Sequence, residues 1–173
     1  MTTMAINQIT IDELKEEEKE AVRQLLVESY QQYEHAYKSA QVWEEYLTNI
    51  IASVDNPNVE KILIAKSDEK ILGTLQLFLS SEKAYQRPEL RIFSPIIRLL
   101  AVHPEARGRG IAQELLKAGL QFAKSQGSKE LYLHSGDKMQ KAIRLYEWFG
   151  FKRDQTKEFY NNDHLVKCYR YDL

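Results

Sequence analysis

The chain passes from an apolar run to an amphipathic helix through a basic, glycine-rich turn, Val102-His103-Pro104-Glu105-Ala106-Arg107-Gly108-Arg109-Gly110-Ile111-Ala112. Residues 96–102 are apolar except for Arg98, as expected of a buried strand. Over residues 111–123, apolar side chains return every three or four positions, as on one face of a helix. We therefore expect the turn at a helix N-terminus, where unpaired N–H groups and the helix dipole attract anions such as phosphate.

The glycines and arginines of this turn suit such a ligand. Gly108 and Gly110 lack a Cβ, so a phosphate can approach their main chain, while Arg107 and Arg109 add positive charge. Neither common nucleotide motif fits, because Gly-x-Gly is followed here by Ile, Ala and Gln. A Walker A loop needs Gly-x-x-x-x-Gly-Lys-Ser/Thr, and a dinucleotide fingerprint needs Gly-x-Gly-x-x-Gly. The alternative is a basic helix entry that holds no ligand.

Two motifs resemble those of the GNAT family of acetyl-CoA-dependent N-acetyltransferases. The first, Arg/Gln-x-x-Gly-x-Gly/Ala, is matched in its fixed positions by Arg107, Gly110 and Ala112. The second is Asn-x-x-Ala-x-x-Leu-Tyr, then three residues, then Gly-Phe; the matching positions are Ala142, Leu145, Tyr146, Gly150 and Phe151. Met139 stands where the family usually has Asn, so no side-chain amide can form a hydrogen bond there.

The order of elements predicts one α/β (α+β) domain over residues 1–173, since no linker or repeat divides the chain. The expected strands cover residues 5–10, 59–66, 71–79, 96–102, 130–134, 151–154 and 164–171. A capping box at Thr10–Glu13 is expected to open the first helix, and further helices cover 40–53, 111–126 and 138–149, with a loop at 80–92. The resemblance implies a GNAT-like mixed, mostly antiparallel sheet flanked by helices, with a splayed central pair of parallel strands.

The composition is that of an ordinary globular protein: 173 residues, 43% hydrophobic and 28% charged, with a net charge of −1. This near balance argues against a nucleic-acid partner, which needs a basic surface. The N-terminus lacks a basic region followed by an apolar segment, and no apolar run approaches ~18 residues, so we expect neither a signal peptide nor a membrane partner. Cys168 is the only cysteine, which excludes an internal disulfide, offers no metal cluster and fits a cytoplasmic protein.

The resemblance implies a site for acetyl-CoA made of three groups of residues. We expect no metal, because His35 and His164 have no partner spacing that suggests one. The pantetheine amides would pair with the backbone of Leu100, Ala101 and Val102. The pyrophosphate would lie on the main chain of Arg107, Gly108, Arg109, Gly110, Ile111 and Ala112. The second motif would add Met139, Ala142 and Tyr146.

The resemblance also implies that Tyr146 is the catalytic residue and assists the departing thiolate. A phenol with a pKa near ~10 protonates a thiolate of about 8.5 slightly uphill, so this assistance is expected to be modest. The alternative is that Tyr146 is a core aromatic residue.

The reaction implied is transfer of an acetyl group to a primary amine of a small molecule or peptide, by direct attack in a ternary complex. An amine with a pKa of about 10.4 must first lose a proton, which costs roughly 4.6 kcal/mol at pH 7. The family often has a Glu on the central strand for this purpose, but residues 94–97 are Ser, Pro, Ile and Ile. Glu89, His134 and Asp137 remain candidate bases, with loop surface, a packed strand end and a helix cap as their structural alternatives.

We expect the acceptor pocket to be lined from the first two helices and from residues 80–92, which contribute Tyr33 and Arg87. Tyr33 also continues an apolar helix face and is alternatively core. The sequence does not specify the amine, the general base or the oligomeric state, a homodimer included. Two other functions stay open: a non-catalytic acyl-CoA-binding or sensor module, favoured by Met139 and the absent Glu, and, more remotely, a nucleic-acid-associated interaction protein.

Overall fold

The computed structural model describes residues 8–173, so part of the strand expected at residues 5–10 lies outside the described residues. The chain forms two compact units. The first comprises the residues up to Pro57 with 61–76 and 99–116, and the second comprises 58–60, 77–98 and 117–173. That residues 1–173 act as one domain stays a prediction.

Strands pair in the order β1-β2-β3-β4 in the first unit. Their bounds are Thr10–Glu13 for β1, Lys61–Ser67 for β2, Lys70–Phe78 for β3 and Ile96–Val102 for β4, the last two reaching into the second unit. The β2–β3 hairpin confirms the prediction from the polar turn, where Asp68 and Glu69 take φ values of 51° and 69°. Two consecutive residues with positive φ match the twist of the strands they connect.

The capping box expected at Thr10–Glu13 is wrong, because these residues form β1. They pair antiparallel with β2, from Thr10 opposite Lys66 to Glu13 opposite Leu63, so their backbone groups bond to a strand instead of opening a helix. A short 3₁₀ turn at Glu16–Glu18 comes next. Its Glu18 side chain accepts a hydrogen bond from the Lys15 amide at 2.9 Å.

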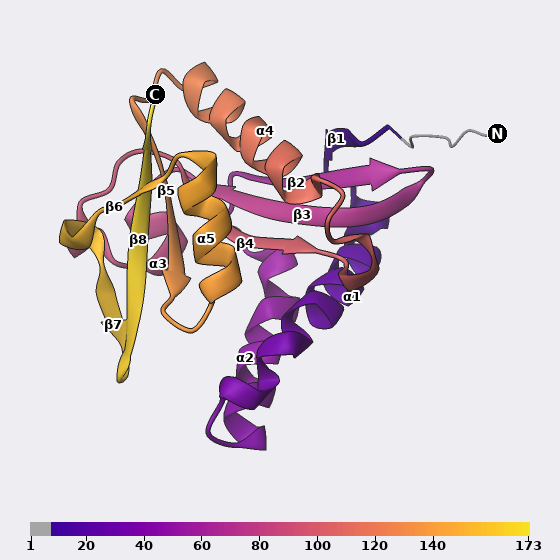
Figure 1. Ribbon diagram of the computed structural model, residues 1–173, viewed down its shortest axis with the longest axis horizontal. Coiled ribbons are helices and arrows are strands. Elements are labelled where there is room, and N and C mark those ends of the chain that lie inside the picture. The colour runs from indigo at the N-terminus through magenta and orange to yellow at the C-terminus, as the bar shows by residue number, and fades with distance from the viewer. Residues whose placement is uncertain (1–7) are drawn as a thin grey trace. The chain divides into compact units, whose positions relative to one another are not determined.

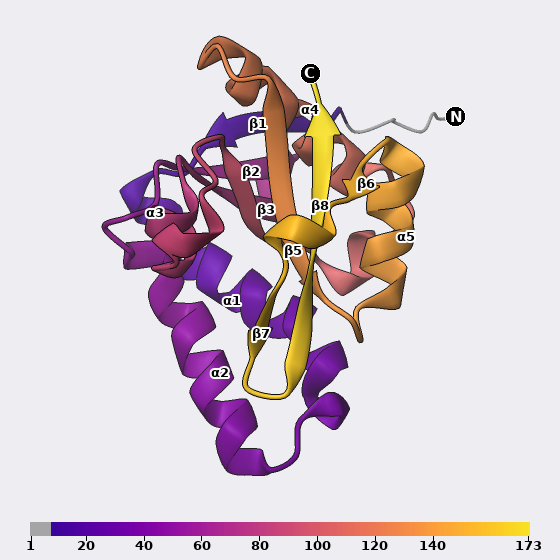
Figure 2. The ribbon, with the colours of Figure 1, turned by 90° about the vertical axis from the view of Figure 1, so that its left-hand side faces the viewer.

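Two helices of the first unit, α1 (Lys19–Tyr30) and α2 (Ala40–Ala52), pack against each other (Figures 1 and 2). Helix α2 confirms the helix predicted at 40–53; Ser39 caps it by accepting from the Val42 amide, and Trp43 is buried. The buried face of α1 consists of Val22, Leu25, Leu26, Ser29 and Tyr30.

Strand β4 and helix α4 (Ile111–Ser125) confirm the elements predicted on either side of the glycine-rich turn. The N-terminal part of α4 lies close to β3 because residue 73 is glycine. A Cβ on Gly73 would lie 2.8 Å from Ile111 Cγ2, 3.0 Å from Leu115 Cδ1 and 3.2 Å from the Ala101 carbonyl oxygen. The absence of that one atom lets the helix approach the strands.

In the second unit the strands pair in the order β4-β5-β8-β6, with β7 also on β8. Figure 2 shows β6 and β7 beside β8. The bounds are Glu130–Gly136 for β5, Lys152–Arg153 for β6, Phe159–Asn161 for β7 and His164–Asp172 for β8. Strands β4 and β5 are parallel, with Ile96 opposite Tyr132, whereas β5 and β8 are antiparallel along their length. The mixed, mostly antiparallel sheet flanked by helices is confirmed, and β7 is an addition that the sequence did not predict.

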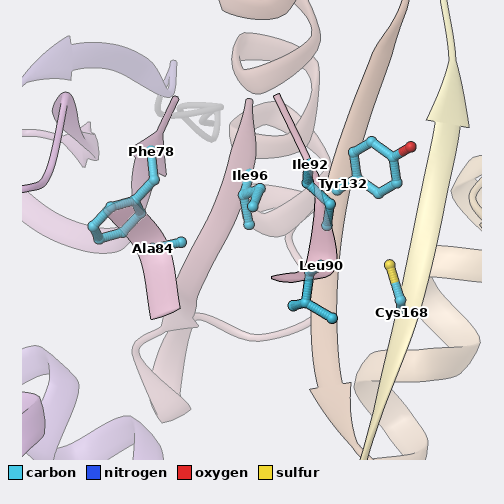
Figure 3. Close-up of a cluster of buried hydrophobic side chains, with 7 residues drawn as sticks. All are labelled: Phe78, Ala84, Leu90, Ile92, Ile96, Tyr132 and Cys168. Atoms are coloured by element: carbon cyan, nitrogen blue, oxygen red, sulfur yellow. The ribbon is translucent and has the colours of Figure 1, made fainter. Parts of the chain in front are cut away.

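Residues 80–92 are not simply a loop. They form helix α3 (Ser81–Tyr85) and a 3₁₀ turn at Pro88–Leu90. The Ser80 hydroxyl accepts from the Lys83 amide at 3.2 Å and so caps α3. This segment contributes to the core of the second unit, shown in Figure 3, which consists of Phe78, Ala84, Leu90, Ile92, Ile96, Tyr132 and Cys168. Cys168 is a buried core residue, and burial raises the pKa of its thiol.

Candidate cofactor and acceptor site

His103 fixes the start of the glycine-rich turn through both ring nitrogens. Its Nδ1 accepts a hydrogen bond from the Glu105 amide at 3.1 Å, so Nε2 carries the proton and donates to Glu28 Oε2 at 2.8 Å. The His103 amide donates to the Leu72 carbonyl at 2.8 Å, and the His103 carbonyl accepts from the Ala106 amide at 2.8 Å. The turn is thereby tied to α1 and β3 within the first unit.

The glycines of the turn have the conformation and the open space that anion binding requires. Gly108 and Gly110 have φ values of 82° and 77°, which residues with a Cβ rarely adopt. No atom lies within 4 Å of a Cβ built on Gly108, and only Gln113 Oε1, at 3.8 Å, lies near one built on Gly110. The Glu114 amide makes the bond to the Gly110 carbonyl, so the amides of residues 111–113 precede the helical ladder.

Arg107 and Arg109 are exposed at this turn. Arg107 Nη2 lies 3.4 Å from the Ser29 carbonyl oxygen, near the end of α1. Its positive charge also reaches Tyr33: burial raises the pKa of the Tyr33 phenol, and Arg107 opposes that rise. The predicted acceptor residue Tyr33 and the predicted cofactor residue Arg107 are therefore neighbours.

Leu99, in the middle of β4, has a φ of 53°, in the left-handed region. A left-handed conformation in a residue with a branched side chain costs about 1–3 kcal/mol and interrupts a strand's regular pleat. The parallel ladder with β5 comprises Ile96 opposite Tyr132 and Ile97 opposite Leu133, before this residue. After it come Leu100, Ala101 and Val102, the residues expected to pair with pantetheine.

Tyr33 belongs to a group of aromatic rings, in tilted or edge-on contact, on α1, α2 and the segment between them. The ring pairs have centroids 5.0 to 6.3 Å apart. The members are Tyr30, Tyr33, Tyr37, Trp43 and Tyr46. Tyr33 is half-buried and lies in the 3₁₀ turn Gln31–Ala36, after α1 ends at Tyr30, so it does not continue the apolar face of that helix. Its role as a pocket wall stays a prediction.

The second motif forms helix α5 (Gln140–Phe149) in the second unit. Met139 is its N-cap residue and makes no side-chain capping bond, as expected when Asn is absent. Ala142 is half-buried, whereas Tyr146 is 7% exposed, with its ring 6.2 Å from Phe151 and 6.5 Å from Tyr169. The tyrosine of the motif is held firmly by packing.

Of the candidate bases, only His134 is enclosed. Its ring contacts Tyr85 at 4.8 Å and Phe159 at 5.4 Å, and its Nε2 donates to the Lys157 carbonyl at 3.0 Å. Burial lowers the pKa of His134 to about 4. The imidazole is therefore neutral at pH 7, and the packed strand-end interpretation agrees with this environment.

The other two candidates lie on the surface or in a turn. Glu89 is exposed and pairs with Arg87 at 3.3 Å. Asp137 is not the cap of α5, because Met139 occupies that position. Arg87, the second predicted acceptor residue, lies over the Phe159 ring at 4.3 Å, and it belongs to the second unit whereas Tyr33 belongs to the first.

Sequence reasoning missed Arg98, which it treated only as an interruption of an apolar strand. The Arg98 guanidinium lies 4.8 Å from the Tyr85 ring centroid and donates to the Ala84 carbonyl at 2.6 Å. A charged side chain inside an apolar run was the available signal. Its partners on α3 could not be anticipated, because residues 80–92 were expected to form a loop.

Comparison with known proteins identifies relatives of the chain. A family model described as the acetyltransferase (GNAT) family matches residues 19–151. The chain is 33% identical over 97 residues to human N-acetyltransferase 8B, covering 56% of this chain and 40% of that protein. It is also 33% identical over 90 residues to human N-acetyltransferase 8, covering 52% and 37%. The aligned part thus spans about two fifths of these relatives.

Solved structures share the fold at lower sequence identity. The PaiA N-acetyltransferase of Thermoplasma acidophilum, in complex with coenzyme A, is 18% identical with a TM-score of 0.71, covering 96% of this chain and 99% of that one. A GNAT-family acetyltransferase of Staphylococcus aureus Mu50 is 21% identical with a TM-score of 0.66, covering 96% and 99%. Within residues 8–173, no helix is long and apolar enough to cross a membrane, and no cluster of three or more His, Cys, Asp and Glu side chains could hold a metal ion.

Proposed function

Since the chain belongs to the acetyltransferase (GNAT) family, we propose that it transfers an acetyl group from acetyl-CoA to a primary amine. The observation that carries the proposal is the turn at residues 107–112. In this turn Gly108 and Gly110 have left-handed backbone conformations, and the space around them is open. The amides of residues 111–113 come before the first hydrogen bond of the helix. The names of the human relatives, N-acetyltransferases, and the coenzyme A in a structure of similar fold support the same chemistry.

Each part of the cofactor has a proposed binding segment. The pyrophosphate accepts hydrogen bonds from the main chain of Arg107 to Ala112, where the helix dipole favours negative charge. The pantetheine amides pair with the backbone of Leu100 to Val102, as an added strand pairs with an edge. The left-handed Leu99 supports this role, because it ends the regular pleat of β4 before those three residues.

We assign Tyr146 to the leaving group. Its phenol stabilises the sulfur as the thioester breaks, and the packing of its ring against Phe151 and Tyr169 holds it in position. Met139 and Ala142 complete the cofactor contacts of the second motif. Because the His134 pKa of about 4 makes it a poor acceptor for an amine proton, the amine enters the site neutral and attacks the thioester carbonyl directly in a ternary complex.

The experiment that tests this function measures release of free coenzyme A from acetyl-CoA. The protein is supplied in turn with polyamines, aminoglycosides, amino acids and peptides with free N-termini. Acetyl-CoA consumption that depends on the amine, with the acetylated product identified by mass, is the expected result. Tight acetyl-CoA binding without consumption for any amine contradicts the proposal.

That second outcome describes a non-catalytic acyl-CoA-binding or sensor module. Met139 at the position usually held by Asn, and Ile96 and Ile97 where the family often has Glu, favour this second candidate. The fold and the motif turn support it equally, so only turnover separates the two functions.

A further inference from the structure

A group of three polar side chains in the second unit has hydrogen-bonding capacity that the described residues leave unused. Arg98 comes from β4, Tyr85 from α3 and His134 from β5. The Tyr85 ring joins them: the Arg98 Cζ and the His134 ring centroid each lie 4.8 Å from its centroid. Three polar groups from separate segments thus meet around one aromatic ring.

The Arg98 guanidinium carries an uncompensated positive charge. It is half-buried, lies over the Tyr85 ring and 5.6 Å from the Phe78 ring centroid, and makes its hydrogen bond to a neutral carbonyl, that of Ala84. Among residues 8–173 it has no carboxylate partner. Removing a cation from water without a counter-charge is unfavourable, and an arginine fork is shaped to bind a carboxylate through two parallel hydrogen bonds.

Acidic side chains close to this group are already engaged elsewhere. Glu158 pairs with Arg153 through both carboxylate oxygens, at 2.7 and 2.9 Å. Asp154 binds Arg170 at 3.0 Å. The carboxylates of Glu158 and Asp154 are thus unavailable to Arg98, and a bound ligand can supply the anion.

His134 and Tyr85 each have a hydrogen-bonding atom that the described residues leave unused. The His134 Nε2 donates to the Lys157 carbonyl, which leaves Nδ1 as a bare acceptor. That nitrogen is buried and has no hydrogen-bond partner among the described residues. The Tyr85 hydroxyl likewise makes no hydrogen bond within residues 8–173, although the Tyr85 ring is packed against Phe159 at 5.3 Å.

We propose that the group formed by Arg98, Tyr85 and His134 binds the carboxylate of an amine acceptor that carries both an amino group and a carboxylate. Arg98 pairs with the carboxylate, Tyr85 donates its hydroxyl proton to the same anion, and His134 Nδ1 accepts from an N–H of the ligand. The partly buried rings of Tyr85 and Phe159, 5.3 Å apart, offer an apolar wall beside it. The proposal rests on the proposed acetyl transfer only in assigning this anion to the acceptor.

Matched pairs of acceptors test the proposal. L-α-Amino acids are supplied beside their carboxamides, which keep the amine and side chain and lose the negative charge. Wild-type protein should show a KM at least tenfold lower for the acids at equal concentrations of neutral amine. The Arg98→Gln variant should raise the KM for the acids at least tenfold and change that for the carboxamides by less than twofold, with Arg98→Lys in between.

The controls separate recognition from folding. Arg91→Gln removes the same charge from an exposed position outside β4, after the 3₁₀ turn at Pro88–Leu90, and should leave the kinetics with both acceptor types unchanged. Acetyl-CoA affinity and thermal unfolding are measured in every variant. The proposal is overturned if Arg98→Gln raises the KM equally for acids and carboxamides, or if the wild type uses both equally well. Acetyl transfer would stand in either case.

Calorimetry with the coenzyme A-loaded protein covers the case in which no acceptor is turned over. Binding of the L-α-amino acids that is lost in Arg98→Gln supports the carboxylate site and contradicts acetyl transfer. Absence of both turnover and binding for every acid overturns the carboxylate site.

Discussion

At the residue scale, Tyr146 is the residue proposed to act on the leaving group. The Tyr146→Phe substitution keeps the ring against Phe151 and Tyr169. We expect kcat to fall by about 10² or less with acetyl-CoA affinity nearly unchanged, because the phenol acts mainly on the leaving sulfur. Steady-state kinetics and calorimetry measure the two quantities.

Tyr169→Phe is the matched control for that experiment, since it removes a hydroxyl from the same packed group of rings. It should leave kcat unchanged. Equal rates in wild type and Tyr146→Phe would show that Tyr146 is a core aromatic residue and nothing more.

Tyr33 and Arg87, which we expect to line the acceptor pocket, give a second prediction at this scale. Tyr33→Ala and Arg87→Gln should each raise the acceptor KM or change which amine is used. The Kd for acetyl-CoA should stay within about threefold, roughly 0.65 kcal/mol, because neither residue belongs to the cofactor turn. Both constants are measured on the same preparation. Unchanged acceptor kinetics in both variants would place the pocket elsewhere.

At the scale of a single element, the N-terminus of α4 depends on the open main chain at Gly110. A Gly110→Val substitution should weaken acetyl-CoA binding at least tenfold, about 1.4 kcal/mol, because a β-branched side chain blocks the approach to the helical amides. Isothermal calorimetry gives the affinity directly. Equal acetyl-CoA affinities in wild type and Gly110→Val would contradict the assignment of the pyrophosphate to this turn.

Gly127→Val controls for the backbone strain of that substitution. Gly127 has a φ of 73°, close to the value at Gly110, and a Cβ at this position would have no atom within 4 Å. It follows the opposite end of α4, far along the helix from the proposed pyrophosphate site. The substitution should lower thermal stability to a similar extent and leave acetyl-CoA affinity unchanged.

Elements with strong local periodicity were predictable, and those defined by distant partners were not. The strand at 96–102 and the helix from 111 follow from their apolar patterns, and the structure confirms them. Thr10–Glu13 resembles a helix cap locally, but its pairing with β2, which is distant along the chain, makes it a strand. Helix α3 is only five residues long, too short for a period to be visible.

The candidate site divides in the same way. The glycine-rich turn was predicted because its spacing and charge lie in one short segment. Arg98 was not, because its role depends on Tyr85 and Ala84, which come from a different element. Site residues whose role depends on a short sequence motif could thus be predicted from the sequence. Those whose role depends on contacts with another element required the structure.

At the scale of the whole molecule, His134 couples folding to pH. The folded-state pKa of about 4 lies below the unfolded value of 6.5, so the unfolded chain takes up a proton first as the pH falls. Stability from this residue is complete above pH 6.5 and is lost progressively toward pH 4. The free energy of unfolding should fall by about 2 kcal/mol between pH 7 and pH 5 through this residue.

Urea unfolding of wild type, His134→Gln and His35→Gln at both pH values measures that contribution. The loss on acidification should be smaller by about 2 kcal/mol in His134→Gln, and unchanged in His35→Gln, because His35 lies outside the enclosed group of rings around Tyr85. Comparing variants removes the contribution of carboxylates whose pKa is lowered in the fold, such as Glu18 beside Lys66. An identical loss in all three proteins contradicts the neutral, enclosed state of His134.

The missing Cβ of Gly73 makes this position a spacer between β3 and the segments proposed to hold the cofactor. Its three nearest atoms belong to Ile111, Leu115 and Ala101, two of which are proposed cofactor residues. Adding one methyl group would require the Ile111 and Leu115 side chains to shift and would crowd the Ala101 carbonyl oxygen. A mutation of Gly73 can therefore weaken cofactor binding, although Gly73 is not among the residues proposed to contact the cofactor. A mutational screen limited to those residues would miss it.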